Sequence, residues 1–103
     1  MADHLAHGVI GAGHPCLPGH FPGHAVVPAV VLLDFAARSL GQALGRGVRI
    51  VAIPAVKFLR PCLPEQPFSV SLQIDEAART ARFSIAGAGA ELANGRFEYA
   101  DAA

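Results

Sequence analysis

The sequence of 103 residues has no tryptophan, one methionine, one tyrosine and two cysteines. Two cysteines are too few for the disulfide framework that stabilises many small secreted domains. Residues 1–13 also lack the basic segment and apolar run of a secretion signal. We therefore expect a cytoplasmic protein in which Cys16 and Cys62 are reduced.

Charge is scarce as well, at 16% of the residues, and eight basic residues balance eight acidic ones. A zero net charge provides no overall basic field for nonspecific nucleic-acid binding. The longest apolar run, residues 25–37, contains Pro28 and Asp34 and is shorter than the roughly 20 residues of a membrane span. The sequence predicts neither a nucleic-acid partner nor a membrane partner.

The chain is nevertheless 52% hydrophobic, which excludes a disordered tail. Its length predicts a single domain over residues 1–103. A chain this short buries only about 60 to 65% of its unfolded surface. We therefore expect some of the apolar surface to be covered by another subunit, in a homodimer or a higher homo-oligomer.

Composition divides the domain into a loop, a helix and a region of strands. Residues 8–28 hold five of the eleven glycines and four of the eight prolines, which predicts a structured loop. Pro28 can start a helix and Gly45 can end it, so the helix is predicted over Ala29–Leu44. Its core face is predicted from three- and four-residue spacing to hold Val30, Leu33, Ala37, Leu40 and Leu44, with Asp34, Arg38 and Gln42 as a separate polar row.

The second half of the chain has the two-residue period of strands. Alternation is cleanest over residues 68–74, and strands are also predicted over 80–86, 91–99 and 48–60, the last interrupted at Pro54. Short loops predict antiparallel neighbours, and an additional strand can come from the N-terminal region. One helix packed on an antiparallel sheet predicts the α+β class.

Two motifs in the N-terminal loop give little support for cofactor chemistry. Gly11-Ala12-Gly13 lacks the third glycine and the Lys-Ser or Lys-Thr pair of a phosphate-binding turn. His14, Cys16, His20 and His24 can ligate metals, but their spacing fits no common zinc pattern. We expect neither a metal nor a cofactor.

His20 and Asp34 are candidates for proton transfer, because an imidazole titrates near neutral pH and the carboxylate lies within an apolar helix segment. Apolar neighbours predict a dehydrated carboxylate that can hold a proton. The alternative is an exposed ion pair between Asp34 and Arg38, four residues later, with His20 as an ordinary loop residue.

The segment from His14 to Asp34 resembles the active-site signature of the hotdog-fold (3R)-hydroxyacyl-[acyl carrier protein] dehydratases. His20-Phe21-Pro22-Gly23 matches a His-Phe-x-Gly loop, and Val27-Pro28 matches the family's helix start. An acid follows the histidine at fourteen positions, as in the family. Ala29 replaces the family's glycine and Ala25 replaces a usual proline. Residues 56–61 and 64–67 resemble the family's next strand and turn.

The resemblance implies a hotdog fold and a role for each matched residue. His20 would remove the C2 proton of a 3-hydroxyacyl thioester, Asp34 would protonate the departing C3 hydroxyl, and the Ala29 amide would face the thioester carbonyl. It further implies a homodimer in which the histidine and the acid of one site come from different subunits. Candidates for an apolar acyl tunnel are Phe21, Val26, Val27, Val30 and Phe58.

The substrate would arrive on acyl carrier protein or coenzyme A, with no cofactor. Arg49, Lys57 and Arg60 are candidate contacts for an acidic carrier, although solvated charges at a sheet edge explain them equally well. The pathway can be fatty-acid synthesis or a polyketide or aryl-polyene type of synthesis. Two alternatives remain open: a hotdog acyl thioesterase, and a noncatalytic subunit that binds acyl thioesters.

Overall fold

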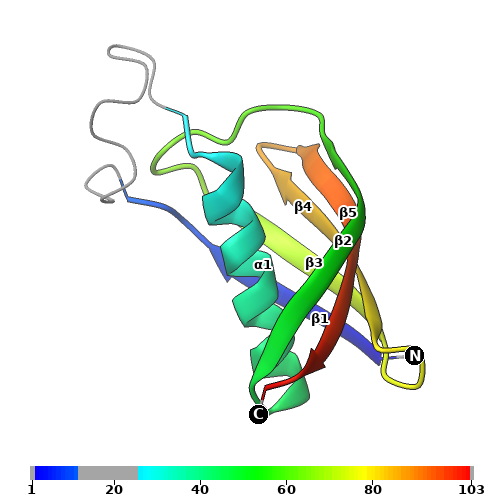
Figure 1. Ribbon diagram of the computed structural model, residues 1–103. Helices are drawn as coiled ribbons and strands as arrows, with labels where there is room; N and C mark the ends of the chain where they lie inside the picture. Colours follow the sequence, from blue (N-terminus) through cyan, green and yellow to red (C-terminus); the bar gives the residue numbers. More distant parts are fainter. Residues whose placement is uncertain (1, 12–25, 103) are drawn as a thin grey trace.

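The computed structural model describes residues 2–11 and 26–102 of the chain. Over these residues, a helix lies along one face of a five-stranded antiparallel sheet (Figure 1). The elements in chain order are β1 (Ala2–Gly8), α1 (Ala29–Leu44), β2 (Val48–Phe58), β3 (Phe68–Asp75), β4 (Thr80–Gly87) and β5 (Ala90–Asp101). The predicted α+β class is confirmed, and so are the helix bounds and the additional N-terminal strand.

Helix α1 begins and ends where its flanking residues predict. Pro28 occupies the N-cap position with φ −59° and ψ 145°, an extended conformation that precedes the first helical turn. Gly45 ends the helix in the left-handed region at φ 70°, and its N–H donates to the Gly41 carbonyl at 2.9 Å. A glycine adopts this conformation without a Cβ clash, so the C-terminal carbonyls gain a partner.

The predicted core face of α1 is confirmed except at Val30. Leu40 is fully buried, and Leu33, Ala37 and Leu44 are partly buried against the core, whereas Val30 is 67% exposed. The most buried row of the helix is completed by Leu32, Ala36 and Ser39. Residues 30–33 are all apolar, so the spacing fits two neighbouring helix faces equally well, and contact with the sheet selects between them. The predicted polar row of Asp34, Arg38 and Gln42 lies outside this buried row.

The strand order in the sheet is β1-β3-β4-β5-β2. Strands β3, β4 and β5 are consecutive neighbours, as short loops predict, but β2 pairs with β5 instead of β3. The expectation that all these strands are neighbours is therefore wrong for β2 and β3, because residues 59–67 form a longer connection between them. β2 is also continuous through Pro54, where its pairing shifts register between Ala52 and Ala55. An edge strand tolerates such a proline at a bulge.

The core lies between α1 and the facing side of the sheet. Leu40, Val70, Ile85 and Phe97 are fully enclosed, and the Phe83 ring stacks on Phe97 with centroids 4.6 Å apart. Partly buried side chains of α1 and of the first half of β2 pack against this cluster. The sheet therefore holds the start of α1 next to the end of β2.

Candidate functional site

The start of α1 is fixed by the connection between β2 and β3. The Val27 N–H donates to the Cys62 carbonyl at 2.8 Å, which ties the segment before the helix to this connection. The Leu59 N–H donates to the Leu92 carbonyl, also at 2.8 Å, and ties the same connection to β5. Residues 59–62 are thus held beside the helix N-terminus.

A pocket of about 290 Å³ lies between these segments. Its lining residues are mostly apolar: Val26, Val27, Ala29, Leu32, Phe58, Leu59, Arg60, Pro61 and Cys62. The structure therefore brings three predicted tunnel residues, Val26, Val27 and Phe58, together with Ala29. Val30 is not part of this lining, and Phe21 lies outside the described residues.

Ala29, which lines this pocket, is the first residue of α1. The first N–H groups of a helix have no partner within the helix, and here the Val31 N–H is satisfied by the Pro28 carbonyl at 3.0 Å. Within residues 2–11 and 26–102 the Ala29 N–H has no hydrogen-bond partner, and the first turn contains no acidic side chain. The positive end of the helix dipole is therefore available to a carbonyl oxygen.

Asp34 lies away from the pocket and is exposed in the single chain. Its Oδ2 is 2.9 Å from Arg38 Nε, and 57% of the Asp34 side chain and 78% of the Arg38 side chain are exposed. The predicted dehydration of this carboxylate is thus not present in one chain, because Asp34 belongs to the outward row of α1. His20, and with it His14, Cys16 and His24, lies outside the described residues.

The three predicted carrier contacts do not form one cluster. Arg49, Lys57 and Arg60 are all exposed. Arg60 lines the pocket and Lys57 is close to it in sequence, whereas Arg49 pairs with Ala100 near the other end of β2. At about 3.3 Å per residue, Arg49 and Lys57 are roughly 26 Å apart along the strand. Only Lys57 and Arg60 are near the pocket.

Sequence reasoning missed several lining residues, of which Cys62 is the most enclosed at 1% exposure. Burial raises the pKa of the Cys62 thiol, which is free, so it forms a neutral apolar part of the wall. No local pattern indicates that residues 59–62 return to the helix start. Only the resemblance of residues 56–61 to a family strand singled out part of this segment.

The described residues contain no group of three or more histidine, cysteine or acidic side chains that could hold a metal ion. The same residues include no helix with the length and hydrophobicity needed to cross a membrane.

Strand β2 forms one edge of the sheet and carries exposed apolar side chains. Val51, Ile53 and Val56 are between 38% and 54% exposed, and Phe58 and Leu59 continue this surface at 46% and 50%. The free edge of an apolar strand is a template for pairing with another chain. We name Val51, Ile53, Val56, Phe58 and Leu59 the β2 edge surface.

Comparison with known proteins places these features in a family. The model of the ApeI-like family, described as ApeI dehydratase, matches residues 3–96. A 3-hydroxyacyl-[acyl-carrier-protein] dehydratase FabZ of Haemophilus influenzae strain PittEE is 28% identical over 94 residues, covering 82% of this chain and 64% of that protein. The chain thus spans just under two thirds of the length of this curated relative.

Solved structures agree on the fold. The dehydratase heterocomplex ApeI:P from Xenorhabdus doucetiae aligns with a TM-score of 0.85 at 20% identity, over 94% of this chain and 86% of that one. A fluoroacetyl-CoA thioesterase, FlK, aligns with a TM-score of 0.77 at 20% identity, over 96% and 84% of the two chains. These likenesses confirm the predicted hotdog fold. Because the family model covers nearly the whole sequence, the chain belongs to the ApeI-like dehydratase family.

Proposed function

We propose that this protein dehydrates a (3R)-3-hydroxyacyl thioester, carried by acyl carrier protein or coenzyme A, to the trans-2-enoyl thioester. One observation carries the proposal: an apolar pocket is lined by Ala29, the first residue of α1, whose N–H has no partner among the described residues. The apolar wall suits an acyl chain and the amide suits the thioester oxygen. Family membership and the FabZ relative support the same reaction.

The elimination requires a base, an acid and a site for developing negative charge. His20 takes the C2 proton, and the C2–H electrons form the new C2–C3 double bond as the C3–O bond breaks. Asp34 gives its proton to the departing hydroxyl, which leaves as water. Charge that accumulates on the thioester oxygen is stabilised by the Ala29 N–H and the helix dipole.

The position of Asp34 supports a site shared between two chains. Successive helix residues are about 100° apart, so Asp34 is roughly 200° around α1 from Leu32, which lines the pocket. The acid and the pocket of one chain therefore lie on different sides of the helix. A second subunit that pairs along the β2 edge surface provides a route by which the acid of one chain serves the pocket of the other.

The first test measures enoyl-thioester absorbance and free thiol together, with 3-hydroxyacyl thioesters of several chain lengths. We expect enoyl formation by the wild type and a loss of about 10²- to 10⁴-fold in kcat in His20→Ala and Asp34→Asn. Arg38→Gln is the matched control, because it removes the ion pair and keeps the carboxylate. Near-normal turnover in Asp34→Asn would remove the acid role.

Released thiol without enoyl product would instead identify a thioesterase, the activity named for the FlK structure. Saturable binding without either product would favour a noncatalytic subunit. In that case the assay is repeated with a candidate second dehydratase subunit, since the Xenorhabdus structure is described as a heterocomplex.

Mixing two inactive variants tests whether the site is shared. In a dimer formed from His20→Ala and Asp34→Asn chains, one of the two shared sites regains an intact histidine and an intact acid. Random re-association therefore restores about a quarter of the wild-type sites. Sites confined to one chain would each keep a substitution, so no recovery after subunit exchange would refute sharing.

A further inference from the structure

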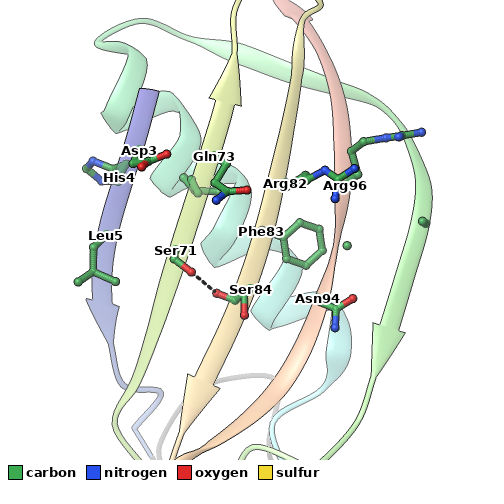
Figure 2. A pocket seen from close by; sticks show the side chains of 13 residues that line it. Asp3, His4, Leu5, Ser71, Gln73, Arg82, Phe83, Ser84, Asn94 and Arg96 are labelled. Carbon is green, nitrogen blue, oxygen red and sulfur yellow. Dashed lines mark hydrogen bonds between the residues drawn. The ribbon is translucent and has the colours of Figure 1, made fainter. Parts of the chain in front are cut away.

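A groove of about 770 Å³ crosses the sheet on the face away from α1 (Figure 2). Residues of all five strands line it, and α1 lies behind the strands in this view. Buried Ile74, Ala81 and Phe97 face the core, so their neighbours Gln73, Arg82 and Arg96 face the other way. We call this feature the outer groove.

The strand register places two arginines side by side in the outer groove. Arg82 of β4 is directly opposite Arg96 of β5, and Gln73 of β3 is directly opposite Arg82. Like charges in directly opposed positions destabilise a sheet. This pairing therefore has a cost for the fold with nothing bound.

Neither arginine has a compensating acid within the described residues. The ion pairs among these residues involve Arg38, Arg46 and Arg79, and none involves Arg82 or Arg96. Nε of Arg96 is also buried without a hydrogen-bond partner. The nearest acids by register are Glu98, two residues along β5 from Arg96, and Asp75, opposite Thr80 and diagonal to Arg82, with Asp3 one strand further away. Asp75 accepts a hydrogen bond from the Ala78 N–H, and none of the three forms an ion pair with the two guanidinium groups.

The adjoining row of polar side chains is, by contrast, already engaged. Ser84 Oγ donates to Glu91 at 2.6 Å, and the Asn94 amide donates to the other oxygen of the same carboxylate at 3.0 Å. Ser71 Oγ donates to the Ser84 carbonyl at 3.5 Å (Figure 2). On strands β3, β4 and β5, the unused side-chain donors of the outer groove are therefore concentrated at Gln73, Arg82 and Arg96.

We propose that Arg82 and Arg96 bind a phosphate group in the outer groove, with the Gln73 amide as a further donor. A phosphate monoester has nearly two negative charges at neutral pH and can neutralise both guanidinium groups, whereas a carboxylate has one. Planar guanidinium groups also match phosphate oxygens in bidentate geometry. Because the groove lies across the sheet from the pocket at the helix start, this site is separate from the proposed dehydratase site.

Thermal unfolding and titration calorimetry test the proposal with inorganic phosphate and with glycerol 3-phosphate, against sodium chloride at equal ionic strength. We expect wild-type protein to gain stability in a saturable way with phosphate beyond the chloride effect. A response to both probes indicates recognition of the phosphate group itself. A response to the ester alone indicates an organic phosphate as the ligand.

Arg82→Gln and Arg96→Gln should weaken phosphate binding about ten- to hundredfold. Without phosphate, each variant should unfold at the same temperature as the wild type or at a higher one, because the repulsion between the guanidinium groups is removed. Arg82→Lys keeps the charge and should bind phosphate more weakly than the wild type. Arg49→Gln is the matched control, an exposed arginine on β2 outside the groove, and should bind normally.

Three results would overturn the proposal. One is an equal response to phosphate and chloride. Another is normal phosphate binding by Arg82→Gln and Arg96→Gln. The third is a groove covered by a second copy of the chain, shown by dissociation of Arg82→Glu in sedimentation together with no phosphate response in the wild type. Phosphate-dependent shifts of the arginine Nε–H and Gln73 amide signals in NMR spectra would locate the bound group directly.

Discussion

The β2 edge surface predicts that paired charges on this strand will dissociate the protein. Val51→Lys with Ile53→Lys is the sharpest change, because both side chains are exposed in one chain, at 54% and 38%, and neither lines the pocket at the helix start. Exposed positions tolerate lysine in the folded monomer, so the variant should fold. The same lysines at an edge strand oppose pairing with another chain.

The expected magnitude follows from the area that remains exposed. Full burial of a valine or isoleucine side chain contributes about 1.5 to 3 kcal/mol, so burying the exposed parts of these two contributes roughly 1.4 to 2.8 kcal/mol per chain. A two-fold symmetric dimer contains each substitution twice, which doubles the loss to about 3 to 6 kcal/mol. At about 1.4 kcal/mol per factor of ten, the dimer Kd should rise by roughly 10² to 10⁴.

Sedimentation velocity over a wide concentration range measures this shift, with circular dichroism as the check on folding. Ala77→Lys is the control, an exposed alanine in the turn between β3 and β4. The reasoning fails if the wild type is monomeric at the highest concentration, or if the double variant associates like the wild type. Should the monomer be unstable, the wild-type Tm will rise with concentration and the variant Tm will not.

Three further predictions concern the fold. Leu40→Ala removes a fully enclosed side chain of α1 and should cost about 2 to 5 kcal/mol of unfolding free energy, measured by urea titration against Gln42→Ala. Gly95→Ala should cost about 1 to 3 kcal/mol in the same assay, because its Cβ would lie 2.5 Å from the Ala55 carbonyl oxygen and 2.7 Å from Phe83 Cζ; an unchanged urea midpoint would contradict this close approach. Hydrogen bonds from Arg46 and Arg79 lower the pKa of Asp101. The ionised carboxylate therefore contributes fully to the free energy of unfolding above about pH 4, and this contribution is lost as the pH falls through the lowered pKa. Asp101→Asn should therefore flatten the acid side of the stability–pH curve, and a curve parallel to that of the wild type would refute this linkage.

How far the fold could be predicted depended on whether the signal was local. Pro28 and Gly45 act on the adjacent turns of backbone, and they defined both ends of α1 correctly. The pairing of β2 with β5 depends on contacts between distant segments. Alternation of apolar residues identifies a strand but says nothing about its neighbour, so the strand order could not be derived.

The candidate site shows the same division between features that local sequence indicates and features that depend on distant segments. Resemblance to a known signature selected Val26, Val27, Ala29 and Phe58, and the structure brings these residues to one pocket. Cys62 was missed because long-range hydrogen bonds, from Val27 to Cys62 and from Leu59 to Leu92, bring its segment to the pocket. Arg82 and Arg96 were missed for a related reason: alternation places each on the outer face, but only the register places one opposite the other.

Strand β2 connects assembly with the proposed chemistry. Its last residue, Phe58, lines the pocket, and Val51 and Ile53 of the same strand belong to the exposed edge. If one site takes its pocket from one chain and Asp34 from the other, a separated chain retains an acyl pocket without an acid. The double lysine variant should then bind acyl thioester as a monomer and turn it over only in proportion to the remaining dimer. Activity per chain that stays constant on dilution through dissociation would mean that each chain holds a complete site, and the exposed position of Asp34 would need another explanation.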